Sequence, residues 1–227
     1  MTTIAELLPA RRERSGEATR RRILDAAEVE FAAKGFDGAR LAAIARAADV
    51  PQALIHHHFG DKQGLYREVL ERALAAMAAV GWHILDTLGP PRKRGRAKRF
   101  GRGELQSLVE ALVGMLVDFY ATHARVLRIL RLEAMRGGPL AGELVRAHVK
   151  PQLDDVVARF EEMRQSGEVR ADVDARHLCI STVAMACFPY TEEAFLEAVW
   201  SLDPQSPAFA DERRREIVRT VMARITP

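Results

Sequence analysis

Residues 39–62 have the sequence ARLAAIARAADVPQALIHHHFGDK, which predicts two short helices joined by a tight turn. In residues 41–48 the apolar side chains recur at intervals of three and four, so they share one helix face. Asp49 follows, and Asp tolerates the left-handed backbone conformation that such a turn often needs. Pro51 suits the first position of the second helix, where no N–H is required. We therefore expect a helix-turn-helix here.

The second of these helices, residues 52–58, is too short to be stable alone and must be held by its neighbours. Ile55 and Phe59 lie four residues apart and are expected to pack into a core. A helix held from behind, with small and hydrogen-bonding residues exposed near its N-terminus, suits recognition in the DNA major groove. An ordinary helical hairpin is the alternative. The residues left facing outward are Gln52, Ala53, Leu54, His56 and His57.

Residues 18–70 as a whole resemble the N-terminal domain of the tetracycline-repressor (TetR) family of bacterial regulators. The resemblance implies a homodimer that binds pseudo-palindromic DNA and releases it when a small molecule enters the C-terminal domain. It also places Lys62 where the family has a phosphate-contacting lysine. The matching residues are TRRRILDAA at 19–27, Phe31, Gly35, Phe36, Ile44, Ala45, Ala48, Val50, Phe59, Lys62 and Leu65.

Several positions depart from the family pattern. Asp49 stands where Gly is usual, Pro51 where Ser or Thr often caps the recognition helix, and Ala39 where Thr is frequent. His56, His57 and His58 replace residues that are commonly aromatic. These changes fit the local geometry, but they weaken the transfer of individual contacts, above all the phosphate contact usually made by a Tyr at the position of His56.

We assign direct base recognition to three side chains of the second helix. Gln52 can make paired hydrogen bonds to adenine, Leu54 can contact a thymine methyl group, and His57 can donate or accept a hydrogen bond. Arg40 and Lys62 more plausibly contact the phosphate backbone. Ala53 and His56 complete the predicted DNA-contacting set.

The composition predicts an all-α protein. Of 227 residues, 48% are hydrophobic and 29% charged, with helical periodicity throughout and no sustained strand pattern. The sequence contains no run of about 18 apolar residues, so no membrane span is expected. The first residues lack the apolar core of a signal peptide, so a cytoplasmic location is expected. Cys179 and Cys187 are expected to be free thiols, since about 12 Å of helical rise would separate them.

We divide the chain into a loose arm (1–17), a three-helix DNA-binding domain (18–62) and a helical regulatory and dimerisation domain (63–227). The expected helices after residue 61 cover 62–88, 104–120, 124–135, 140–165 with a bend near Pro151, 174–188, 191–202 and 208–225. By resemblance, residues 178–188 and 217–225 would form a four-helix bundle between two subunits. Both stretches are also apolar enough to be ordinary core.

A basic loop covers residues 89–103, where seven Lys and Arg residues have no acidic counterpart. Its Pro and Gly residues exclude a continuous helix. Such a loop can add salt-dependent contacts to DNA phosphates, or it can be a solvated loop away from DNA.

An effector pocket is expected by resemblance among the helices from residue 104 to 188. The same Met and aromatic residues at helical spacing would also suit a plain core. The candidate lining residues are Met115, Phe119, Tyr120, Leu127, Leu130, Met163, Met185 and Phe188.

The remaining features give no chemistry of their own. Adjacent histidines on a helix point about 100° apart and cannot converge on one metal ion. No metal, cofactor or catalytic set is predicted, because no paired carboxylates, nucleophile with a base or phosphate loop has supporting context. The sequence therefore predicts a DNA-binding regulator released by an unknown effector, with a helical binding module that lacks specific DNA recognition as the alternative.

Overall fold

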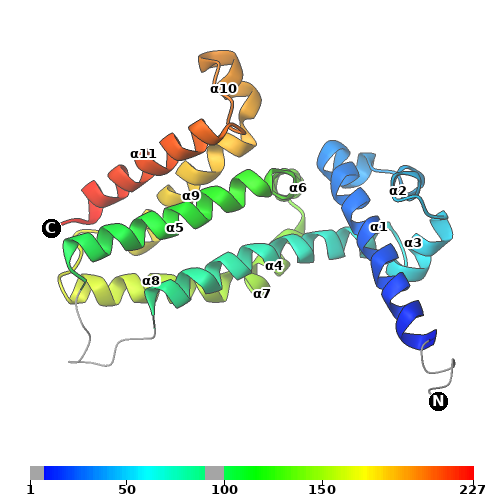
Figure 1. Cartoon of the computed structure of the whole chain (residues 1–227), viewed down its shortest axis with the longest axis horizontal. Helices are drawn as coiled ribbons and strands as arrows, with labels where there is room; N and C mark the ends of the chain where they lie inside the picture. Colours follow the sequence, from blue (N-terminus) through cyan, green and yellow to red (C-terminus); the bar gives the residue numbers. More distant parts are fainter. Residues whose placement is uncertain (1–7, 90–99) are drawn as a thin grey trace. The chain divides into compact units, whose positions relative to one another are not determined.

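The computed structural model describes residues 8–89 and 100–227, and its regular elements there are all helices. The chain divides into two compact units: the first runs up to Ala73 and includes Arg128–Leu144, and the second comprises Leu74–Leu127 and Val145–Pro227. The all-α prediction is confirmed. In order, the helices are α1 (Leu8–Gly38), α2 (Leu41–Ala47), α3 (Gln52–Phe59), α4 (Lys62–Leu88), α5 (Arg102–Thr122), α6 (Ala124–Met135), α7 (Pro139–His148), α8 (Lys150–Gln165), α9 (Ala175–Thr191), α10 (Glu193–Trp200) and α11 (Pro207–Ile225) (Figure 1).

The largest differences from the predicted helix boundaries lie at two places. The first helix starts at Leu8, so residues 8–17 of the predicted arm are helical, in keeping with their Ala, Arg and Glu content. The predicted helix over 140–165 is two helices, because α7 ends at His148 and α8 starts at Lys150 beside Pro151. Residues 1–7 and residues 90–99 of the basic loop lie outside the described residues, and Arg102 already belongs to α5.

The first unit is built around the face of α1 that carries Ile23, Ala27 and Phe31, all fully buried. Phe31 packs edge-on against Tyr66 of α4, with ring centroids 4.8 Å apart. Because α4 contributes side chains to this core as far as Leu70, the unit extends beyond the predicted boundary at residue 62. Gly35, with φ 66°, interrupts α1, and Phe36 turns back onto Tyr66.

The second unit has α5 at its centre, packed against α9 and α11. This helix is long and apolar enough to cross a membrane, but its apolar residues form the middle of the core cluster. The core position explains the composition of α5. Its buried side chains are Leu105, Leu108, Val109, Val113, Val117, Phe119 and Tyr120.

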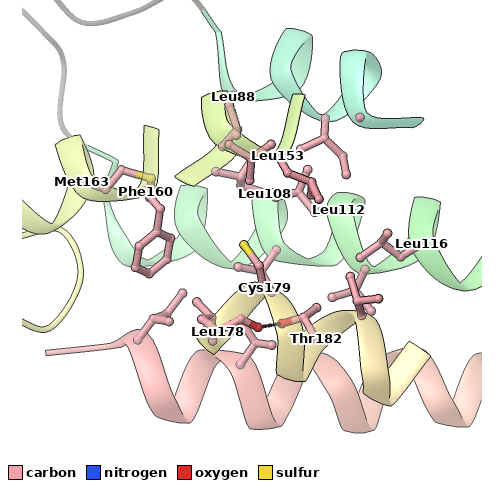
Figure 2. A pocket seen from close by; sticks show the side chains of 18 of the residues that line it. Leu88, Leu108, Leu112, Leu116, Leu153, Phe160, Met163, Leu178, Cys179 and Thr182 are labelled. Carbon is pink, nitrogen blue, oxygen red and sulfur yellow. Dashed lines mark hydrogen bonds between the residues drawn. The ribbon is translucent and has the colours of Figure 1, made fainter. Parts of the chain in front are cut away.

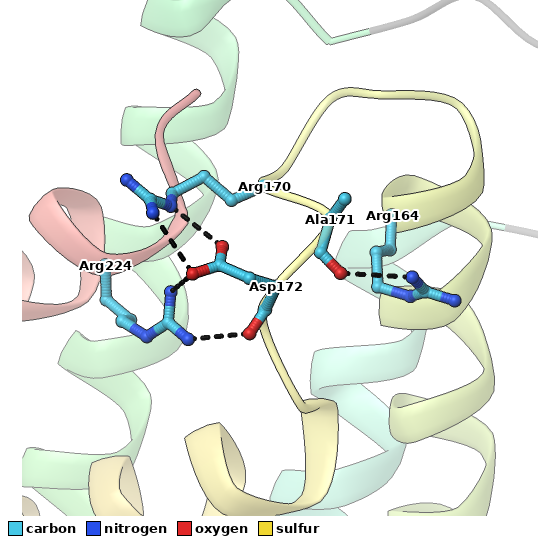
Figure 3. A network of polar contacts seen from close by, with 5 residues as sticks. All are labelled: Arg164, Arg170, Ala171, Asp172 and Arg224. Carbon is cyan, nitrogen blue, oxygen red and sulfur yellow. Dashed lines mark hydrogen bonds and ion pairs between the residues drawn. The ribbon is translucent and has the colours of Figure 1, made fainter.

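The connection between α8 and α9 is tied to the end of α11 by the polar network shown in Figure 3. Asp172 accepts hydrogen bonds from Arg170 Nε at 2.9 Å and from Arg224 at 3.3 Å. These two guanidinium groups, Arg170 first, hold the pKa of Asp172 below its ordinary value. Arg224 also donates to the Asp172 carbonyl at 2.8 Å, and Arg164 donates to the Ala171 carbonyl at 3.1 Å. The network fixes the loop from which α9 starts.

The tight turn before α3 gives a test of the local fold. Asp49 has φ 53°, a conformation that costs most L-residues about 1–2 kcal/mol. We expect Asp49→Gly to keep or raise the free energy of unfolding, and Asp49→Val to lower it by about 1–3 kcal/mol, because a β-branched side chain fits this conformation poorly. Urea denaturation measures both changes. Equal stability of the Val and Gly variants would show that the turn does not depend on this conformation.

Candidate nucleic-acid interface and ligand pocket

The helix-turn-helix is formed by α2 and α3, as residues 39–62 predict. Ile44 and Ala45 of α2 and Ile55 and Phe59 of α3 are buried, so both helices are held by their inner faces. The Val50 N–H donates to the Ala45 carbonyl at 3.0 Å, which closes the turn. Pro51 is the N-cap of α3, with φ −60° and ψ 139°. The sequence predicted it as the first helical residue, so the helix begins one residue later than expected.

The outer face of α3 presents most of the predicted recognition residues. Gln52, Ala53, His56 and His57 are exposed, whereas Leu54 is half-buried. Within the part of the chain that the structure describes, the side chains of Gln52 and His57 have no hydrogen-bond partner. Their hydrogen-bonding groups are therefore available to a partner outside the chain.

His56 differs from its neighbours because its ring is already engaged. Its Nδ1 lies 2.9 Å from the Gly60 carbonyl oxygen, so Nδ1 carries the proton that this hydrogen bond needs. In the neutral ring Nε2 is then an acceptor and cannot donate to a phosphate oxygen. A phosphate contact of the kind a Tyr makes at this position would require the doubly protonated ring.

Arg40 and Lys62, the two predicted phosphate contacts, are held differently. Lys62 Nζ donates to the Asp37 carbonyl at 3.2 Å and lies 4.9 Å from the centroid of the Phe36 ring. Two of its three N–H donors remain. The Arg40 backbone N–H donates to Glu30 Oε1 at 3.3 Å, while its side chain is exposed. Asp61 caps α4, since its Oδ1 accepts a hydrogen bond from the Gly64 N–H at 2.8 Å.

The most buried acidic side chain of the first unit was not found by sequence reasoning. Glu133 of α6 is 4% exposed, and its Oε2 accepts a hydrogen bond from the Tyr66 hydroxyl at 2.9 Å. Burial, and then this hydrogen bond, raise the pKa of Tyr66 above its ordinary value. Arg136 lies 3.5 Å from Glu133, 3.0 Å from Asp37 and over the Phe36 ring. Residues of α6 are thus fixed to α4 and to the segment before α2.

A cavity of about 160 Å³ lies among α4, α5, α8, α9 and α11 in the second unit (Figure 2). Apolar side chains form most of its wall, and the polar ones are Gln152, Cys179 and Thr182. None of the lining residues is charged. They are Gly81, Ile84, Leu88, Leu105, Leu108, Val109, Leu112, Val113, Leu116, Gln152, Leu153, Val156, Phe160, Met163, Leu178, Cys179, Thr182, Val183, Val221 and Ile225.

Of the predicted pocket residues, only Met163 lines this cavity. Phe119, Tyr120 and Leu127 are buried in the packed core, and Met185 packs against it. Phe188 is 46% exposed and lines a separate surface hollow with Trp200. Leu130 is half-buried in the part of α6 that belongs to the first unit, and Met115 is half-buried on α5. The candidates were chosen as Met and aromatic residues, whereas the helix faces that border this cavity carry mainly Leu and Val.

Cys179 and Cys187 are both free and both lie on α9, as predicted. Burial raises the pKa of the Cys179 thiol, which keeps it protonated. Among residues 8–89 and 100–227 no group of three or more His, Cys, Asp or Glu side chains is arranged to hold a metal ion.

A helix-turn-helix with an exposed recognition helix, joined to a helical unit that encloses an apolar cavity, defines a class of DNA-binding regulators. Two family profiles match the chain: "Bacterial regulatory proteins, tetR family" over residues 23–69 and "Tetracyclin repressor-like, C-terminal domain" over residues 106–221.

Similar proteins are also transcriptional regulators. The HTH-type transcriptional repressor SCO4008 of Streptomyces coelicolor is 30% identical over 174 residues, which cover 76% of this chain and 79% of the repressor. The HTH-type transcriptional regulator RutR of Escherichia coli is 25% identical over 227 residues, the whole of both chains. The structure of FadR from Bacillus subtilis in complex with stearoyl-CoA is similar in fold, with a TM-score of 0.60, 16% identity and coverage of 87% and 96%.

The chain belongs to the TetR family of bacterial transcriptional regulators. Members of this family are DNA-binding regulators and not enzymes.

The Tyr66–Glu133 hydrogen bond gives a second test. We expect Tyr66→Phe to lower the free energy of unfolding by about 1–3 kcal/mol, because Glu133 stays buried and loses its donor. Tyr190→Phe is the matched control, since the Tyr190 hydroxyl is buried and has no hydrogen-bond partner among the described residues. Chemical denaturation of both variants supplies the comparison. A loss for Tyr66→Phe no larger than that for Tyr190→Phe would mean that this bond does not stabilise the unit.

Proposed function

We propose that this protein is a homodimeric repressor that binds a palindromic operator and leaves it when a small molecule enters the cavity of the second unit. The observation that carries the proposal is the outer face of α3, where Gln52 and His57 are exposed without hydrogen bonds to residues 8–89 or 100–227. A cytoplasmic location follows from the proposed target, chromosomal DNA. The same fold holds a small molecule in Bacillus subtilis FadR, which was solved with stearoyl-CoA.

Base recognition is assigned to Gln52 and His57, with Leu54 reduced to a partial apolar contact by its half-burial. Arg40 is assigned to the phosphate backbone because its side chain is exposed. Lys62 has the same assignment, and its contacts with Asp37 and Phe36 orient its ammonium group before DNA binds. Ala53 leaves room for close approach of the helix, and His56 contributes only through Nε2.

The dimer surface is assigned to α9 and α10. Ile180, Ala184 and Phe188 are exposed at intervals of four on α9, and Phe195 and Trp200 of α10 continue this apolar surface. Apolar surface of this kind is unfavourable on a monomer in water. The second predicted bundle stretch, 217–225, contributes less, because Ile217, Val221 and Ile225 are buried in the chain's own core.

Signal transfer is assigned to α4. This helix supplies Lys62 to Ala73 to the first unit and Leu74 to Leu88 to the second. Gly81, Ile84 and Leu88 line the cavity, while Lys62 starts the same helix. A ligand that favours one position of α4 thereby favours one position of the DNA-binding unit.

The decisive experiment is selection of bound sequences from a random duplex DNA library by the purified protein at two salt concentrations. Recovery of a palindrome with half-sites about one helical turn apart supports the proposal. Recovery of only unpatterned, salt-sensitive DNA would reject sequence recognition and favour a binding module that contacts DNA through charge alone.

Two substitutions separate base recognition from backbone contact. We expect Gln52→Ala to cost about 1–3 kcal/mol on the selected operator and to relax the preference at one base position. Lys62→Ala should weaken binding to all sequences alike and lower the salt slope by about one. Fluorescence anisotropy with matched and mismatched duplexes measures both effects. If Gln52→Ala lost the same factor on every duplex, Gln52 would not recognise a base.

The dimer surface is tested at Ile180, which is 64% exposed. We expect Ile180→Glu to raise the dimer dissociation constant at least about tenfold, since the substitution places two charges in the apolar interface. Val29→Glu is the matched control, because Val29 is 50% exposed on α1, outside the apolar surface of α9 and α10. Sedimentation velocity over a concentration series measures the dissociation constants. Unchanged association of Ile180→Glu would move the interface elsewhere.

A further inference from the structure

We propose that the cavity binds an uncharged, mainly apolar molecule that donates one hydrogen bond to the carboxamide of Gln152. The inference rests on the proposed function in that it names the chemical class of the effector for the same cavity.

The absence of charge in the wall disfavours ligands whose ionised group would lie inside the cavity. The cavity is bordered by Leu108, Leu112 and Leu116 of α5 on one side and by residues of α9 on another (Figure 2). A carboxylate or phosphate enclosed there would lose its hydration without meeting a cationic partner, which is strongly unfavourable. A neutral ligand with an apolar body instead gains from leaving water.

Gln152 is the polar side chain of the wall that most needs a partner. It is 5% exposed, and its Oε1 is buried without a hydrogen-bond partner among the described residues. A buried amide oxygen in this state is unfavourable unless a ligand or water completes it. The position is enforced by close packing, since a Cβ atom on Gly81 would lie 2.9 Å from the Cβ atom of Gln152. Rotation of the terminal carboxamide alone can present the oxygen to the cavity.

The Thr182 hydroxyl group of the wall also favours a ligand that donates a hydrogen bond. The Thr182 hydroxyl donates to the Leu178 carbonyl at 2.8 Å, so its proton is used and its oxygen keeps capacity only to accept. Cys179 is a protonated thiol and therefore a weak donor. Gln152 Oε1 and Thr182 Oγ1 are thus both hydrogen-bond acceptors, and a ligand donor is complementary to them. The Nε2 amino group of the same Gln152 carboxamide is a donor that a ligand oxygen can use in addition.

The volume of the cavity limits the size of the molecules that can test this proposal. At about 160 Å³ it is comparable to the apolar cavity of about 150 Å³ that binds benzene in another protein. A benzene ring with one small alkyl group and one hydroxyl group satisfies both the volume and the polarity. Three matched probes separate the requirements: 4-ethylphenol, its methyl ether 4-ethylanisole, which lacks the donor, and 4-ethylbenzoate, which is charged.

The experiment is isothermal titration calorimetry of the three probes with the full-length protein at pH 7, without DNA. 4-Ethylphenol is uncharged at this pH, because phenols ionise near pH 10. We expect it to bind at least about tenfold more tightly than 4-ethylanisole, with no detectable binding of 4-ethylbenzoate. In Gln152→Leu the phenol and the ether should bind within about twofold of each other. Gln106→Leu, which removes an exposed carboxamide on α5, is the control and should keep the wild-type ratio.

Thermal denaturation without ligand shows whether Gln152→Leu is folded. Because the substitution removes a buried oxygen that has no partner, we expect the melting temperature to rise by a few degrees. Should the Leu variant be unstable, Gln152→Met, which keeps the unbranched shape, serves for the same titrations.

The inference is overturned if the wild type binds the ether as tightly as the phenol, if the benzoate binds most tightly, if none of the three binds, or if Gln152→Leu keeps the wild-type preference. Selection of DNA sequences is measured independently. A specific operator combined with any of these results rejects the ligand class and leaves the repressor proposal standing. If the titrations give the expected preferences but no specific operator is selected, the repressor proposal is rejected and the ligand class stands.

Discussion

The burial of Ile55 and Phe59 is the constraint on which the DNA-binding surface depends. An eight-residue helix such as α3 is not stable in water by itself, so its orientation is set entirely by what its inner face contacts. The guanidinium group of Arg20 lies over the Phe59 ring, 5.4 Å from its centroid, and Arg20 forms an ion pair with Glu68 of α4. The outer face of α3 can therefore differ from the family pattern at His56 and His57 without loss of the fold, because position and recognition depend on different residues.

The sequence predicted the local features of the fold but not the contacts between residues that lie far apart in the chain. Helical periodicity and capping residues are local signals, and they correctly placed α2, α3, α4 and the left-handed turn at Asp49. The partnership of Tyr66 with Glu133 joins residues 67 positions apart, and no spacing rule connects them. The pocket was assigned by residue type, but a cavity is defined by which helix faces are left incompletely packed. Of the predicted residues only Met163 therefore borders this cavity, and Gln152 was not among the candidates because sequence alone does not show that this polar side chain is buried.

Helix α9 has two faces with different roles in the second unit. Leu178, Cys179 and Thr182 line the cavity, while Ile180, Ala184 and Phe188 are exposed along the other side. The start of this helix is held by the Asp172 network and by the N-cap hydrogen bond from the His177 N–H to Asp174 at 2.9 Å. Because α9 is held at its N-terminus, we expect a side-chain displacement in the cavity to move mainly the far end of the helix, near Phe188. The proposed ligand and the proposed partner subunit therefore act on the same rigid element.

A ligand changes DNA affinity only by the difference between its affinities for the two states of the dimer. Coupling energies of about 1–3 kcal/mol per site, typical of allosteric proteins, correspond to changes of about 5- to 150-fold. Two cavities in a dimer would contribute twice, or about 2–6 kcal/mol, and only the upper end of this range reaches the roughly 5.5 kcal/mol needed to move a population almost completely. An apolar cavity with one orphaned carboxamide suits this requirement. If the ligand-bound state of the dimer is the one in which the Gln152 carboxamide faces the cavity, the hydrogen bond to the ligand adds to the difference in affinity between the two states.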